Sequence, residues 1–166
     1  MMKKITFLLV FFGMIALQSC TINNDDEVDN DTISEVFEVT RSFGPQNEFS
    51  SLVALNPPIF ASDVVLVYML WDVDDSGEPI WRLMPQTVQL LEGDLQYNYD
   101  FTRFDVNLFL SSLDFNLAIL GPQWTQNQTF RIVIVPGFFS NRVDYRDYDA
   151  VMNHLGHTEA DVKKIN

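Results

Sequence analysis

The chain has 166 residues, of which 47% are hydrophobic and 20% are charged, and this composition is too apolar for a disordered protein. Its 23 Asp and Glu residues outnumber 10 Lys and Arg residues, which excludes a protein that binds nucleic acid by neutralising phosphates. A single cysteine excludes an internal disulfide, a cysteine-rich zinc site and an iron–sulfur cluster. The sequence predicts no cofactor.

Residues 1–19 have the three-part layout of a secretory signal peptide. Lys3 and Lys4 precede an apolar run from Ile5 to Leu17, whose 13 residues fall short of the about 20 that a membrane-spanning helix needs. We therefore expect this segment to be removed. Its removal changes 10 bases to 8 against the same 23 acids, and the net charge from −13 to −15.

The signal segment ends in Leu17-Gln-Ser-Cys20, which resembles a bacterial lipobox. The resemblance implies that Cys20 becomes the first residue of the mature chain and carries palmitate and other fatty acyl chains. Each buried methylene of such chains contributes about 0.8 kcal/mol to membrane binding, so several chains form a lasting anchor. The alternative is an ordinary signal peptide with a chance cysteine.

Residues 20–33 are expected to form a tether after the acylated cysteine. Five acids lie between Asp25 and Asp31 without apolar periodicity, and a flexible coil of this length reaches about 20 Å. The acidic cluster resembles the signal that exports lipoproteins of Bacteroidetes-type bacteria to the outer face of the outer membrane, although a plain soluble spacer has the same composition. Asp31-Thr32-Ile33 resembles an O-glycosylation acceptor of those bacteria, which makes Thr32 a candidate glycosylation site.

Residues 34–166 are predicted to be one all-β domain, because short β-type runs alternate with turn residues up to about Pro136. The spacing favours an antiparallel two-sheet sandwich, with an immunoglobulin-like topology as one candidate. The expected strands are 35–43, 49–55, 63–71, 80–84, 87–91, 95–102, 104–110 and 132–135.

Two of these strands carry a change of parity. Apolar residues occupy odd positions from Leu95 to Phe101 and even positions from Phe104 to Leu110, so a bulge or turn is expected at Thr102-Arg103.

Residues 63–71 are apolar without alternation, which indicates a strand covered on both faces.

The C-terminal residues change to a helical pattern. Residues 147–155 have helical apolar spacing and stop at Gly156, and Thr158 to Asp161 resembles a capping box that opens another turn through Lys164. We expect two short helices that cover the outer face of the strand at 63–71.

Several runs of the domain resemble a functionally unassigned family of small lipoproteins from marine and soil Bacteroidetes. These runs are Ser62–Tyr68, Trp81–Thr87, Asp100–Val106, Asn127–Pro136 and Tyr148–Val151. The resemblance implies an envelope protein. Some members carry a dihydrolipoamide dehydrogenase name, which conflicts with this sequence, because it has no Gly-x-Gly-x-x-Gly motif, no redox cysteine pair and no room for two nucleotide domains.

Two groups of residues have the spacing of metal ligands. Asp72, Asp74 and Ser76 match the first positions of a calcium loop, but Leu83 stands where an EF-hand needs glutamate, and a hairpin explains the same residues. His154 and His157 could join Asp161, but histidines near a helix end more often serve the terminal carbonyls. We therefore predict no metal site and keep the loop at Asp72 as a weak candidate.

Exposed aromatics mark candidate binding positions. Trp124 lies in a polar loop and Phe138-Phe139 follows Pro136-Gly137, so these rings could either contact a protein or glycan partner or plug the end of the sandwich. If the strand after Ser34 runs away from the membrane, its exit turn at residues 44–47 lies at the distal end, and Trp124 is the partner-binding candidate if its loop lies beside that turn.

These features favour a non-enzymatic, lipid-anchored envelope module, in the outer membrane and on the cell surface if the export signal acts. The alternative is a carbohydrate-active hydrolase that uses paired carboxylates, and no pair stands out among the 23 acids. The sequence contains no serine in a nucleophile elbow and no histidine within the β region, so it predicts no catalytic residue.

Overall fold

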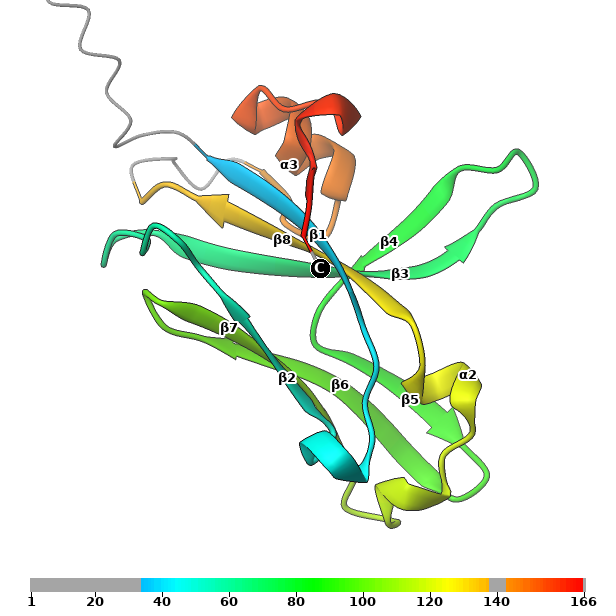
Figure 1. Cartoon of the computed structure of the whole chain (residues 1–166). Helices are drawn as coiled ribbons and strands as arrows, with labels where there is room; N and C mark the ends of the chain where they lie inside the picture. The colour runs from blue at the N-terminus through cyan, green and yellow to red at the C-terminus, as the bar shows by residue number, and fades with distance from the viewer. Residues whose placement is uncertain (1–33, 138–142, 166) are drawn as a thin grey trace, which may run out of the picture. The chain divides into compact units, whose positions relative to one another are not determined.

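The computed structural model describes residues 34–137 and 143–165, all of which belong to one compact unit (Figure 1). The predictions at Cys20, Thr32 and Phe138-Phe139 lie outside these residues. The strands are β1 (Glu35–Arg41), β2 (Ser50–Ala54), β3 (Val64–Val73), β4 (Pro79–Leu83), β5 (Gln86–Leu90), β6 (Gly93–Phe101), β7 (Asp105–Ser111), β8 (Gln128–Val135) and β9 (Lys163–Lys164). The helical elements are η2 (Pro45–Asn47), η3 (Leu117–Ile119), α2 (Pro122–Thr125), α3 (Tyr148–Leu155) and η4 (Glu159–Asp161).

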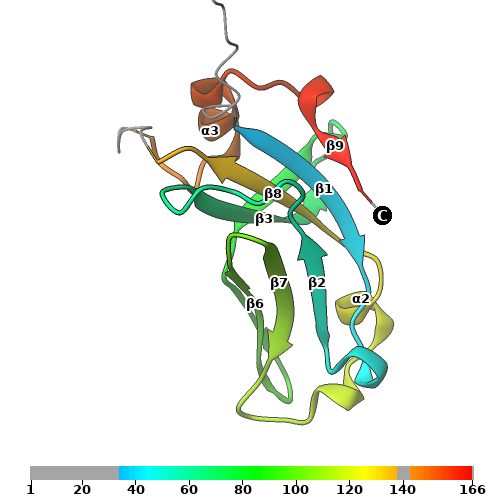
Figure 2. The same ribbon diagram turned by 60° about the vertical axis from the view of Figure 1, so that its left-hand side comes forward.

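The strands form two sheets, and the predicted all-β two-sheet sandwich is confirmed. Sheet A has the order β4-β3-β8-β1-β9, and sheet B has the order β2-β7-β6-β5. Figure 2 shows the strands of sheet A crossing over those of sheet B. All pairs are antiparallel except β1 and β9. All eight strands expected from the sequence are present.

The connectivity differs from the immunoglobulin constant arrangement, in which the first two strands share one sheet, because β1 lies in sheet A and β2 in sheet B. In that arrangement the strand that follows the equivalent of β8 also stays in the sheet beside it. Here β1 occupies that position and pairs with β8 from Glu35↔Ile134 to Arg41↔Gln128. The reason is that the chain leaves sheet A after Val135 to build α3.

The main core lies between the two sheets. It is built from the inward-facing residues of each strand, including Val39, Val67, Leu95, Leu108 and Ile132, all of which are essentially buried. At the predicted change of parity the chain makes a turn. The Thr102 amide donates to the Asp105 carbonyl over 2.9 Å, and the Thr102 hydroxyl donates to the Asp105 carboxylate over 2.7 Å. This turn keeps Leu95 and Tyr97 of β6 and Val106, Leu108 and Leu110 of β7 in the core, whereas Phe101 and Phe104 beside the turn are exposed.

The outer face of sheet A carries a second core. Leu66, Tyr68, Val133 and Val135 face outward from β3 and β8 and pack under the buried side of α3. This confirms the prediction that a C-terminal helix covers the apolar strand at 63–71. The predicted stop is also present, because Gly156 ends α3 at φ +74°. At the other end the Asp147 side chain accepts from the Ala150 amide, a cap that was not predicted from the sequence.

The end of the chain differs from the prediction. The capping box of Thr158 and Asp161 opens only the 3-10 turn η4, and the helix does not continue through Lys164. Instead β9 pairs in parallel with the free edge of β1, and the Ile165 amide donates to the Glu38 carbonyl over 3.0 Å. An uncovered strand edge offers unpaired backbone groups, which a nearby terminal segment satisfies better than one more helical turn would.

Candidate functional site

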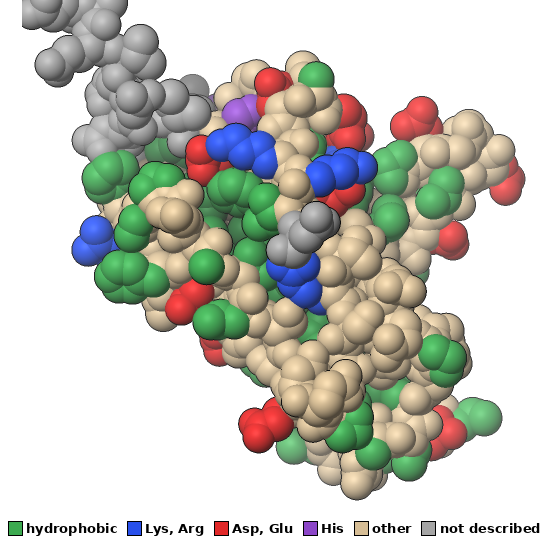
Figure 3. Space-filling view, viewed as in Figure 1, with side chains coloured by type: hydrophobic (Ala, Val, Ile, Leu, Met, Phe, Trp, Pro, Cys, Tyr) green, Lys and Arg blue, Asp and Glu red, His purple; other side chains and the backbone are tan. Residues whose placement is uncertain are grey.

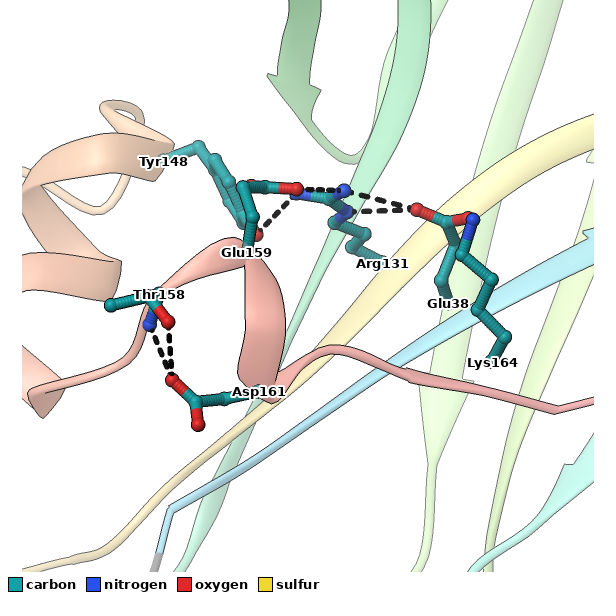
Figure 4. Close-up of polar contacts among 7 residues, drawn as sticks. All are labelled: Glu38, Arg131, Tyr148, Thr158, Glu159, Asp161 and Lys164. Atoms are coloured by element: carbon teal, nitrogen blue, oxygen red, sulfur yellow. Dashed lines mark hydrogen bonds and ion pairs between the residues drawn. The ribbon is translucent and has the colours of Figure 1, made fainter.

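A buried arginine gathers polar side chains on the outer face of sheet A (Figure 4). Arg131 of β8 is only 5% exposed. Its guanidinium donates to Glu38 Oε2 over 3.0 and 3.1 Å, to the two oxygens of Glu159 over 2.5 and 2.6 Å, and to the Tyr148 hydroxyl over 2.6 Å. Lys164 Nζ lies 3.2 Å from the other oxygen of Glu38. We call these five residues the Arg131 cluster.

Aromatic rings enclose the guanidinium of Arg131. Its Cζ lies 4.2 Å from the ring centroid of Trp81 and 5.1 Å from that of Tyr148. Such cation–π contacts stabilise a charge that is removed from water. Trp81 Nε1 is itself buried without a hydrogen-bond partner in the part of the chain that the structure describes.

The ionisation of the Arg131 cluster is set by these contacts. Burial alone would lower the pKa of Arg131, but its bonds to Glu159 and Tyr148 outweigh burial and raise the pKa above its ordinary value. Burial would raise the pKa of Glu38, but hydrogen bonds from Arg131 and Lys164 outweigh it and lower that pKa. Burial raises the pKa of Tyr148 to about 12. The cluster therefore holds fixed charges at neutral pH.

The Arg131 cluster gives little support to hydrolase chemistry. Its two carboxylates, Glu38 and Glu159, both bind the guanidinium of Arg131. A glycosidase needs one carboxyl group with a raised pKa as its acid, whereas the pKa of Glu38 is lowered. The cluster instead links β1, β8, α3 and η4 through the hydrogen bonds and ion pairs of Arg131.

A pocket of about 330 Å³ opens at the other end of the sandwich from the start of β1. Two stretches of chain supply its walls, namely residues 90–92 at the β5–β6 turn and residues 115–124, which run from the loop after β7 through η3 into α2. The lining residues are Leu90, Leu91, Glu92, Phe115, Ile119, Leu120, Gly121, Gln123 and Trp124. We call it the distal pocket.

Trp124 forms part of this pocket and also packs against the main core. It lies in α2, which starts with Pro122 after Gly121, and the Tyr97 hydroxyl donates to the Trp124 carbonyl over 2.7 Å. Trp124 is half-buried. The ring therefore packs against the end of the core, as the plug interpretation expected, and it also lines the pocket.

The exit turn of β1 lies beside α2, so Trp124 is at the same end of the sandwich as that turn. The Phe43 amide donates to the Thr125 carbonyl over 2.7 Å, and the Asn127 amide donates to the Ser42 hydroxyl over 3.0 Å. In Figure 1 η2 and α2 share the lower end of the sandwich, while β1 starts at the upper end. The distal pocket is thus placed away from Ser34.

The distal pocket has both apolar and polar groups in its lining. Leu91 is fully exposed and Ile119 is 60% exposed, so the pocket continues into an uncovered apolar surface. Glu92 is the one carboxylate in its lining, and Asp94 follows in the same turn. The Asp94 amide donates over 2.8 Å to the carboxylate of Asp114, which packs tightly on Gly93 at φ +134°.

The two candidate metal groups have other roles in the structure. Asp74 caps the β3–β4 hairpin, where one of its oxygens accepts from the Ser76 amide, the Ser76 hydroxyl and the Glu78 amide. These bonds lower the pKa of Asp74. Asp72 accepts from the Val73 amide. Within the described ranges no three His, Cys, Asp or Glu side chains group as metal ligands do.

The two histidines are placed differently from one another. His154 lies in the last turn of α3, where the helix dipole favours it. His157 was expected to serve the helix carbonyls, but its Nε2 lies 2.6 Å from the Ser34 hydroxyl and 2.8 Å from the Ser34 carbonyl oxygen. It therefore ties the start of β1 to the C-terminal segment. Asp161 binds Thr158.

Sequence reasoning missed the Arg131 cluster and the distal pocket. The signal for the cluster was present, because an arginine inside the apolar run 130–135 must find partners if the strand is buried. The pocket had no comparable signal, since its two stretches of chain, residues 90–92 and 115–124, meet only in the fold.

No family model, curated protein or solved structure matches this chain. Among the described residues, none of the helices has the length and hydropathy required to cross a membrane.

Glu38→Gln is expected to lower the free energy of unfolding at pH 7 by about 1–3 kcal/mol, because it removes a charge that Arg131 and Lys164 compensate. The pKa of folded Glu38 is lowered, so its contribution is fully present above the ordinary carboxylate pKa and is lost as pH falls through the folded pKa. Urea unfolding from about pH 7 down to about pH 3 should therefore show the wild type and the variant converging.

The exposed acid Glu78 provides the control, since Glu78→Gln removes the same charge away from the Arg131 cluster. A gap between wild type and Glu38→Gln that stays constant with pH would contradict the role given to the Glu38 carboxylate.

Proposed function

We propose that this chain is a lipid-anchored envelope protein of the outer membrane, whose sandwich presents the distal pocket to a protein or glycan partner. The anchor rests on the lipobox resemblance at Cys20 and on the acidic tether of residues 20–33. The binding role rests on the form of the folded domain. The proposal gives the domain no catalytic step.

The observation that carries the binding role is the polarity of the sandwich. The chain enters at Ser34, and β1 then runs through seven residues to the exit turn beside α2. At about 3.3 Å per residue this strand alone spans about 23 Å. A domain tethered at Ser34 therefore holds the distal pocket on the side that an external partner would reach.

The chemistry of the distal pocket favours binding over catalysis. Its volume lies at the lower end of the range of about 300–1,000 Å³ for ligand sites, and its lining combines apolar side chains with polar groups that include Glu92 and Gln123. A single lining carboxylate does not form the pair that glycoside hydrolysis uses. Trp124 offers a ring that could stack on a sugar or receive an apolar side chain.

Cys20→Ala is expected to abolish acylation and to release the protein from the membrane fraction, because Cys20 is the chain's only thiol. The measurement is metabolic labelling with an alkyne fatty acid, followed by separation of membranes from soluble protein. Equal labelling of wild type and variant would refute the anchor. Digestion of the wild-type domain by protease added to intact cells would support surface display.

A photoreactive residue at Leu91 is expected to crosslink to a discrete partner on intact cells, because this side chain is fully exposed at the rim of the distal pocket. The matched control places the same residue at Glu78 in the β3–β4 hairpin, away from the pocket. Trp124→Ala should remove the Leu91 crosslink while circular dichroism still reports a folded sandwich.

Two results would count against the distal pocket. One is a Leu91 crosslink that also forms from Glu78, and the other is a crosslink that persists in folded Trp124→Ala. If Trp124→Ala unfolds, Ile119→Asp at the exposed rim provides the second variant.

A further inference from the structure

Three phenylalanines are exposed at the end of the sandwich where β1 begins. Phe60 in the β2–β3 loop is 46% exposed, Phe101 at the end of β6 is 41% exposed, and Phe104 in the β6–β7 turn is 60% exposed. We call them the phenylalanine surface. Figure 3 shows hydrophobic side chains gathered at this end of the molecule. Exposed apolar groups that cluster mark interaction surfaces more often than isolated ones do.

The two segments that carry these rings are joined by hydrogen bonds. The Ile59 amide donates to the Arg103 carbonyl over 2.9 Å, and the Leu55 amide donates to the Phe104 carbonyl over 2.7 Å. The Arg103 side chain donates back to the Ile59 carbonyl over 3.0 Å. The phenylalanines are therefore held on one platform and do not depend on independent loops to come together.

The register of sheet A places this platform beside the entry of the chain. Glu35 at the start of β1 pairs with Ile134, and Val64 at the start of β3 pairs with Val135. β1 and β3 thus begin at the same end of sheet A, and they flank the last residues of β8. The β2–β3 loop with Phe60 leads directly into Val64, so the phenylalanine surface and Ser34 share one end of the sandwich.

We propose that the phenylalanine surface docks into the lipid–water interface of the membrane in which Cys20 is anchored, an inference that rests on the proposed function. The tether of residues 20–33 reaches about 20 Å, so an anchored domain keeps this end close to the bilayer at a high effective concentration. Aromatic side chains are well suited to shallow insertion at that interface. Docking would fix the orientation of the sandwich and turn the distal pocket outward.

The charges near the surface indicate that the contact is apolar. Asp63 accepts from the Phe60 amide and Asp105 accepts from the Thr102 hydroxyl, so these carboxylates cap the platform's own turns. Arg103 is the base on the platform, and its guanidinium lies 5.9 Å from the Phe104 ring centroid. A second copy of the chain is a poorer occupant, because each anchored copy lacks residues 1–19 and carries 8 bases against 23 acids, a net charge of −15, so the copies repel one another.

The test uses the acylated full-length protein in vesicles of phosphatidylethanolamine with a minor fraction of phosphatidylglycerol. A polarity-sensitive fluorophore is attached at Ala61→Cys, which leaves Phe60 intact, or at the fully exposed Leu113→Cys on the distal side. We expect the emission at residue 61 to shift to the blue and to be quenched severalfold more by lipids with a nitroxide at the headgroup. We expect the fluorophore at residue 113 to remain water-like. Added salt should not reverse the shift, since the contact is apolar.

The variant Phe60→Ser with Phe104→Ser should return the fluorophore at residue 61 to a water-like signal, while the protein stays in the vesicles through its acyl chains. The control Leu52→Ser removes an exposed apolar side chain from edge strand β2 and should change nothing. Water-like emission at residue 61 in vesicle-bound wild type would overturn the docking, as would an unchanged signal in the double variant. Absence of the wild type from the vesicles would instead contradict the lipid anchor.

Discussion

Much of this fold depends on where the guanidinium of Arg131 can find partners. The residue lies in β8 among buried neighbours, and transfer of such a charge out of water costs several kcal/mol unless it is fully paired. Its partners come from β1, α3 and η4, and the ring of Trp81 comes from β4. The C-terminal segment must therefore return across sheet A, and this return brings β9 to the edge of β1 and α3 over the apolar outer face. The ring of Tyr148 contacts the guanidinium of Arg131 and also packs in the second core.

The C-terminal segment occupies the outer face of sheet A. The two ends of the sandwich differ in chemistry. The end beside Ser34 carries three exposed phenylalanines, whereas the opposite end carries the distal pocket, with Glu92 as the carboxylate in its lining. His157 fastens Ser34, the first described residue, to the C-terminal segment. In the function proposed above, one end of the sandwich faces the membrane and the other end faces a partner.

Most of the fold could be predicted from local pattern. The alternation from Leu95 to Phe101, the change of parity at Thr102-Arg103 and the helix that stops at Gly156 each followed from period and turn chemistry. The strand β9 could not be predicted, because two lysines carry no β signal and their pairing is decided by the free edge of β1. The carboxylate partners of Arg131 lie 93 and 28 residues away in sequence, and two distant stretches of chain line the distal pocket. For Trp124 the sequence offered two alternatives, a partner contact and a plug at the end of the sandwich, and the fold shows the ring packed against the core.

The central claim, that Arg131 holds the C-terminal segment on sheet A, is tested most directly by native-state hydrogen exchange of wild type and Arg131→Met. Methionine fills a similar volume without the charge, so the sandwich itself should remain folded. The account predicts that amides of α3 and β9, including the Ile165 amide bonded to Glu38, exchange much faster in the variant, while amides of β6 and β7 in sheet B keep their protection. Unchanged protection of α3 and β9 would contradict the account, as would an equal loss of protection in both sheets.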